Sequence, residues 1–131
     1  MPDLPATTLV NFCYSRMFRG CTALRTAKLL PALTLTEYCY HEMFYECTNL
    51  NHIEIAATDI SASNCLTDWV KSVQTTKGTF VKNSTLTIGI GNSGVPTNWS
   101  VLNNDTVNSK SLKFRSGQNG STIGLEKLST N

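Results

Sequence analysis

The chain has 131 residues, 40% apolar and 15% charged, which is typical of one folded body with a modest core. Its 11 Lys and Arg against 9 Asp and Glu give a formal charge of +2, far from the basic balance of nucleic-acid-binding domains. No stretch approaches the roughly 20 apolar residues that span a bilayer. We therefore expect no nucleic-acid partner and no membrane insertion.

The opening residues, MPDLPATTLV, have neither the basic nor the apolar region of a signal peptide. They also begin directly on a repeat, without the capping segment that normally precedes one. The sequence therefore predicts a fragment of a longer protein, without an export signal of its own.

A tandem repeat organises the first half of the chain. Residues 4–29, LPATTLVNFCYSRMFRGCTALRTAKL, match residues 30–55, LPALTLTEYCYHEMFYECTNLNHIEI, at an offset of 26 residues. A unit of this length hides its apolar residues only by stacking on its neighbour. A degenerate third unit follows, in which Trp69 and Val70 replace the Met and Phe of the first two.

Each unit is expected to contain a short helix followed by a parallel strand. Apolar residues three and four apart predict helices over residues 10–19, from Thr36 onward and over residues 63–73. Gly20 supplies the left-handed residue that ends the first helix, and Glu46 takes that place in the second at a cost of about 1 kcal/mol. Strands are predicted over residues 24–29, 50–55 and 79–81.

The remaining residues are rich in Ser, Thr, Asn and Gly. Residues 83–103 carry a few apolar groups that could cover the open end of the repeats, and we interpret them as a C-terminal cap. Residues 111–126 alternate at period two around Gly117-Gln-Asn-Gly120, which predicts a hairpin. It either packs on the cap or opens a further β domain, within a final segment of residues 104–131.

Five cysteines occupy repeated positions. Cys13, Cys39 and Cys65 are 26 residues apart, as are Cys21 and Cys47. The favoured interpretation is a small core residue in each unit. A disulfide between Cys21 and Cys47 is a weaker alternative, and no CxxC pair suggests a metal site.

No motif predicts catalysis, a cofactor or a metal. Residues 89–94 read GxGxxG, but VPTNW follows instead of the helix that a dinucleotide site requires. His41 and His52 lack metal-binding spacing and are expected at the surface. Recurrence of Tyr14 at Tyr40 favours a packing role for both.

The repeats resemble the BspA-like leucine-rich-repeat proteins of gut-dwelling anaerobic bacteria. The resemblance rests on LPATTL, CYxxMFxGCTxL, ATDISASNC…W and GVPTNW, and covers about residues 4–103. It implies an α/β fold: a short leucine-rich-repeat solenoid over residues 1–82, with a helix and a parallel strand per repeat and a β-rich C-terminal tail. It also implies a cell-surface or secreted parent protein that mediates adhesion or protein binding without catalysis.

If the strands stack at the repeat offset, their outward residues form two rows on one face. Thr26, His52 and Gly78 form one, and Lys28, Glu54 and Phe80 form the other. Lys28 and Glu54 are expected to pair, and Phe80 to offer an apolar contact unless residues 84–101 cover it. The face predicts a monomeric module that binds a protein or host-matrix ligand. The alternative is a structural spacer, and carbohydrate binding is weaker because both tryptophans are assigned to the cap.

Overall fold

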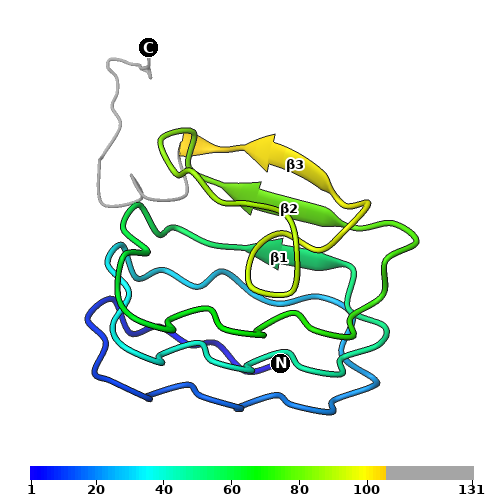
Figure 1. Ribbon diagram of the computed structural model, residues 1–131, viewed down its shortest axis with the longest axis horizontal. Coiled ribbons are helices and arrows are strands. Elements are labelled where there is room, and N and C mark those ends of the chain that lie inside the picture. The colour runs from blue at the N-terminus through cyan, green and yellow to red at the C-terminus, as the bar shows by residue number, and fades with distance from the viewer. Residues whose placement is uncertain (106–131) are drawn as a thin grey trace.

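A computed structural model describes residues 1–105 of the chain, and the hairpin expected at residues 111–126 lies outside that range. Three strands, β1 (His52–Glu54), β2 (Thr79–Lys82) and β3 (Ser100–Asn103), form one sheet. All pairings are parallel, and the strand order β1-β2-β3 follows the chain (Figure 1). The strand predicted over residues 50–55 is therefore confirmed in shortened form, and the one predicted over residues 79–81 is confirmed and extends to Lys82. The strand predicted over residues 24–29 is wrong, because only an isolated bridge at Thr26 forms there.

Successive circuits of the chain lie on one another (Figure 1). Parallel bridges join Thr26 to His52, Leu30 to Ile55 and Thr34 to Asp59, at offsets close to the repeat length. We call residues 10–29 layer 1, residues 36–55 layer 2 and residues 62–82 layer 3. Each layer begins with a turn segment, residues 10–20, 36–46 and 62–72, and ends on the strand side.

The turn segments are not helices, so the expected helix-plus-strand solenoid is wrong. Within residues 1–105 no α-helix forms. A left-handed backbone recurs at every fourth position of each segment, which an α-helix cannot accommodate. These positions are Phe12, Arg16 and Gly20 in layer 1, Tyr38, Glu42 and Glu46 in layer 2, and Asn64, Asp68 and Ser72 in layer 3.

Backbone hydrogen bonds explain why this conformation replaces a helix. In layer 1, the N–H groups of Cys13, Ser15, Met17 and Arg19 donate to the carbonyl three residues back. The intervening N–H groups donate instead to carbonyls of layer 2, as when Tyr14 bonds Cys39 at 3.0 Å. The same alternation joins layer 2 to layer 3. Because every second N–H is used between layers, the turns need the next layer in order to be satisfied.

The core lies between the turn segments and the strands. Buried pairs recur every four residues along layer 2, at Cys39 and Tyr40 and again at Met43 and Phe44. Aromatic rings also stack between layers, with centroids 6.1 Å apart for Tyr14 and Tyr40 and 5.9 Å apart for Phe18 and Phe44. The packing role predicted for Tyr14 and Tyr40 is thus confirmed.

The cysteines also lie at equivalent positions of successive layers. Cys39, Cys47 and Cys65 are buried, and all five thiols are free, so the alternative disulfide between Cys21 and Cys47 is absent. Burial raises the pKa of the Cys47 and Cys65 thiols to about 11, which keeps them protonated and inert at neutral pH. Cys13 and Cys21 are exposed because they belong to the outermost layer.

Residues 89–95 close over the turn segment of layer 3. The N–H of Val70 bonds the carbonyl of Asn92 at 3.1 Å, and the indole N–H of Trp69 bonds the carbonyl of Gly94 at 2.9 Å. A side chain at Gly94 would meet the Gly89 carbonyl oxygen at 2.1 Å. The GxGxxG motif thus builds a tight loop that covers Trp69.

Candidate functional site

A row of polar side chains crosses the strand side of the molecule. Thr26 pairs with His52, His52 with Thr79, and Thr79 with Ser100. Because paired residues of a parallel sheet point to the same face, these four side chains lie in one line. We call Thr26, His52, Thr79 and Ser100 the polar row; each is exposed or half-buried.

A shift in register removes two residues, Phe80 and Gly78, from the outward positions predicted for them. Phe80 pairs with Ile53 and is fully buried, so the outward, apolar contact expected of it is wrong. The spacing from Ile53 to Phe80 is one residue longer than the repeat offset. Since a shift of one residue turns a strand over, Thr79 replaces Gly78 in the row.

An open hollow of about 550 Å³ lies at the centre of the row. Hydroxyl, amide, imidazole and ammonium groups line it, and they come from three layers and β3. The lining residues are Thr26, Asn51, His52, Lys77, Gly78, Thr79 and Ser100. The structure therefore brings two of the predicted site residues, Thr26 and His52, together with four polar residues that were not predicted.

Gly78 shapes the wall of this hollow. A side chain there would meet the Trp99 indole at 2.3 Å, because the ring lies directly against the Gly78 backbone. The Trp99 ring is held in place by a 2.9 Å hydrogen bond from its N–H to the Gln74 carbonyl. The N–H of Ser100 donates to the Gly78 carbonyl at 2.9 Å, so this glycine also aligns β3 with β2.

The charged residues of the face do not pair as expected. Lys28 Nζ lies 3.2 Å from Asp3 Oδ1, and the Glu54 carboxylate lies 4.0 Å from His52 Nε2. The predicted pair between Lys28 and Glu54 is therefore wrong. Asp3 was missed because residues 1–3 precede the repeat, so no repeat position predicted their contacts. Both Lys28 and Glu54 border the polar row and remain accessible to a partner.

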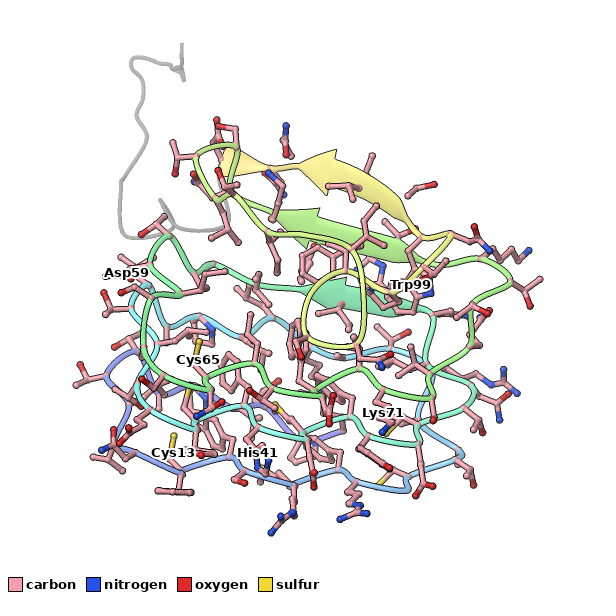
Figure 2. All side chains as sticks on the ribbon, in the orientation of Figure 1. Cys13, His41, Asp59, Cys65, Lys71 and Trp99 are labelled. Atoms are coloured by element: carbon pink, nitrogen blue, oxygen red, sulfur yellow. The ribbon has the colours of Figure 1, made fainter. Side chains whose placement is uncertain are left out.

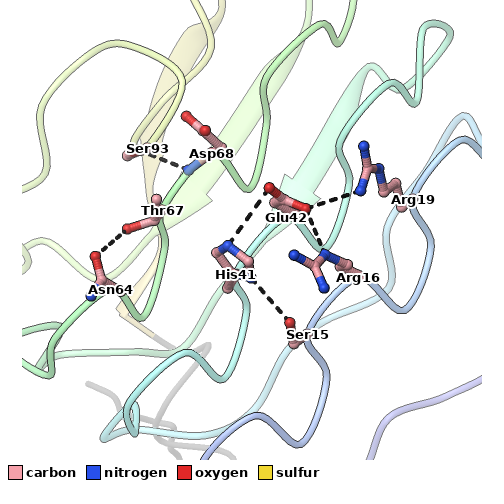
Figure 3. A network of polar contacts seen from close by, with 9 residues as sticks. All are labelled: Ser15, Arg16, Arg19, His41, Glu42, Asn64, Thr67, Asp68 and Ser93. Atoms are coloured by element: carbon pink, nitrogen blue, oxygen red, sulfur yellow. Dashed lines mark hydrogen bonds and ion pairs between the residues drawn. The ribbon is translucent and has the colours of Figure 1, made fainter.

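A second polar cluster lies between the turn segments of layers 1 and 2 (Figure 3). Ser15 Oγ is 3.1 Å from His41 Nδ1, and His41 Nε2 is 3.6 Å from Glu42 Oε2, an order that resembles a hydrolase triad. Acyl transfer also needs free backbone N–H groups beside the nucleophile. Here the N–H groups of Ser15 and Arg16 already bond carbonyls of the protein.

This cluster is better explained as a clamp between layers. Arg16 Nε donates to Glu42 Oε1 at 2.7 Å, and this hydrogen bond is the main reason that the pKa of Glu42 is lowered. His41 was expected at the surface, but its side chain is only 14% exposed. Figure 2 shows His41 on the turn side of the molecule.

Comparison with known proteins finds no matching family model, no similar curated protein and no similar solved structure. Within residues 1–105, no group of three or more His, Cys, Asp or Glu side chains is placed to hold a metal ion. Over the same range no helix is long and apolar enough to cross a membrane.

Proposed function

We propose that this protein is a non-catalytic binding module that recognises a protein or host-matrix ligand through the polar row. The observation that supports the proposal is the alignment of Thr26, His52, Thr79 and Ser100 across the sheet, beside the open hollow. The BspA-like resemblance of the repeats supports this role, and it would imply a protein at the cell surface or outside the cell.

The shape of the face favours an extended polypeptide over a small molecule. Small-molecule sites are usually deep and mostly apolar, whereas this hollow is open and polar. Hydroxyl groups of the row can both donate and accept hydrogen bonds, so they can bond the backbone of a chain laid across the strands. Lys77 and His52 would favour a carboxylate side chain on that chain.

Binding to immobilised, purified extracellular-matrix proteins tests the proposal by biolayer interferometry. The test variant replaces Thr26, His52, Lys77 and Thr79 by Ala. Loss of several hydrogen bonds of about 0.5–1.5 kcal/mol each should weaken binding at least tenfold. A matched control replaces Thr58 and Thr87, two exposed threonines outside the hollow, and should bind like the unsubstituted protein.

Equal binding by the unsubstituted protein and the test variant would contradict a role for the polar row. Binding by neither protein to any matrix ligand would favour the alternative, a spacer that holds another domain away from the cell envelope. Circular dichroism on all variants checks that the sheet is intact, since the replaced side chains are not part of the core.

A further inference from the structure

The face that carries the polar row has a positive charge at the end where β2 begins. Lys77 lines the hollow two residues ahead of Thr79, the first residue of β2. Among residues 1–105, no Asp or Glu side chain lines the hollow or forms an ion pair with Lys77. Lys28 differs in this respect, because its ammonium group lies 3.2 Å from the Asp3 carboxylate. We call Lys77 the positive pole of the face.

A negative charge lies at the opposite end of the same face. Glu54 ends β1 two residues after His52, and alternate residues of a strand point to one side. Its Oε2 atom is 4.0 Å from His52 Nε2, its Oε1 atom has no partner among residues 1–105, and its side chain is 33% exposed. Because His52 pairs with Thr79, Glu54 lies four residues beyond Lys77 along the strand direction. We call Glu54 the negative pole.

We propose that this face binds an extended peptide that carries an acidic and a basic residue four positions apart, a proposal that rests on the binding role of the polar row. An extended peptide rises about 3.3 Å per residue, as the strands do, so its residues i and i+4 reach the two poles from the same side of its backbone. The acidic residue lies against Lys77 and the basic residue against Glu54. The polar row is midway between the poles, and its hydroxyl groups can bond the peptide backbone.

Charges at the two poles select the ligand and its direction, because a like charge at either pole repels the peptide. The test measures binding of a synthetic peptide to the full, 15N-labelled chain by NMR titration. The probe has seven residues and blocked ends, with Glu second, Lys sixth and Thr elsewhere. The control peptide has the same composition with Lys fifth, so that its two charges point to opposite sides. The probe should shift the signals of His52 and Thr79 and bind at least about fivefold more tightly than the control.

Exchange of the charges tests whether Lys77 determines the specificity. Lys77→Glu should weaken binding of the probe about tenfold, because attraction becomes repulsion. A peptide with Lys at both positions should bind this variant about as tightly as the probe binds the unsubstituted protein. Lys71→Glu is the matched control, because it makes the same change of charge in the turn segment of layer 3, outside the hollow, and should leave the affinity unchanged.

No binding of the probe, or equal binding of the probe and the control peptide, would overturn the proposal. So would a loss of binding in Lys77→Glu that the exchanged peptide does not restore, because a purely structural role of Lys77 has that result. Concentration-dependent shifts of the same signals without peptide would identify a second copy as the occupant and would equally overturn it. Failure of the proposed function is a separate result, since it appears as equal binding of matrix proteins by the unsubstituted protein and the polar-row variant.

Discussion

Left-handed residues distinguish the turn segments at the scale of single residues. This conformation costs about 1–2 kcal/mol per residue for most residues, Gly and Asn being the usual exceptions. The chain nevertheless adopts it at bulky positions such as Phe12, Tyr38 and Glu42. Each such segment gains hydrogen bonds to a neighbouring layer, worth about 0.5–1.5 kcal/mol net apiece, and the segments of layers 2 and 3 also bury two side chains per four residues. Stacking therefore offsets the local strain.

Glu46 offers a direct measure of that strain. Its φ is 63°, its side chain is exposed, and Gly20 holds the same repeat position in layer 1. Replacing Glu46 by Gly should raise the free energy of unfolding by about 0.5–1 kcal/mol, because glycine adopts this conformation without steric cost. Chemical denaturation measures the change, and Glu46→Ala, which keeps a Cβ, should not stabilise the protein.

Glu42 should make stability depend on pH. Its hydrogen bond from Arg16 lowers its pKa below the usual 4.5, so the native state favours the charged carboxylate. This contribution is present above the unfolded pKa and is lost as pH falls through the folded pKa. Because Arg16 is more than half exposed, we expect only about 1 kcal/mol.

The measurement compares unfolding free energies of the parent and Glu42→Gln at neutral pH and at successively lower pH. The difference between the two proteins should be largest at neutral pH and should disappear below the folded pKa of Glu42. A difference that stays constant across this range would show that the carboxylate charge has no part in the clamp.

At the scale of elements, the sheet depends on the contact between Gly78 and Trp99. The indole lies where a Cβ of residue 78 would be, and β3 follows directly after Trp99. Replacing Gly78 by Ala should displace the ring and lower the free energy of unfolding by about 1–3 kcal/mol, as overpacking commonly does. Tryptophan fluorescence and denaturation measure the two effects.

Gly89→Ala is the matched control for this substitution. A Cβ at Gly89 would meet no atom within 4 Å, and the residue does not have a left-handed backbone. Its stability and fluorescence should remain close to those of the parent. If Gly78→Ala behaved in the same way, the close approach of Trp99 to the sheet would be disproved.

The turn segments show how one apolar pattern can suit two conformations. Spacings such as Cys13 to Met17 and Tyr14 to Phe18 fit both a helix and a turn that repeats every four residues. The buried positions recur at four residues through Cys39, Met43 and Cys47 without drift. A helix of 3.6 residues per turn would rotate these positions about 40° per step.

At the scale of the whole molecule, the layers differ in how completely they are packed. Layer 2 is covered on both sides, the turn segment of layer 3 is covered by residues 89–95, and the turn segment of layer 1 has one open edge. The same residue type should therefore contribute unequally to stability, according to its layer.

The methionines test this gradient at one repeat position. Met43→Ala should lower the free energy of unfolding by about 2–5 kcal/mol, because it removes a fully buried side chain. Met17→Ala should cost less than half as much, since that side chain is already half exposed. Denaturant titration of both variants measures the difference, and equal losses would contradict the open edge of layer 1.

The sequence alone determined which residues of the repeats take equivalent positions in successive layers and where β1 and β2 lie, but it predicted neither the absence of a strand at residues 24–29 nor the presence of β3. The 26-residue offset aligns Tyr14 with Tyr40 and Thr26 with His52, and their contacts follow from it because identical units bury their side chains by lying on one another. Thr26 and His52 in the candidate site were predicted in this way.

Only the tertiary structure decided the conformation of the turn segments and the composition of the site. Whether an N–H bonds within its own segment or to the next layer depends on a neighbour that local spacing does not reveal. One extra residue between Ile53 and Phe80 then turned β2 over, burying Phe80 and placing Thr79 in the polar row. Lys77 and Ser100 line the hollow because strand pairing and the contact of Trp99 with Gly78 set the register of β3 against β2.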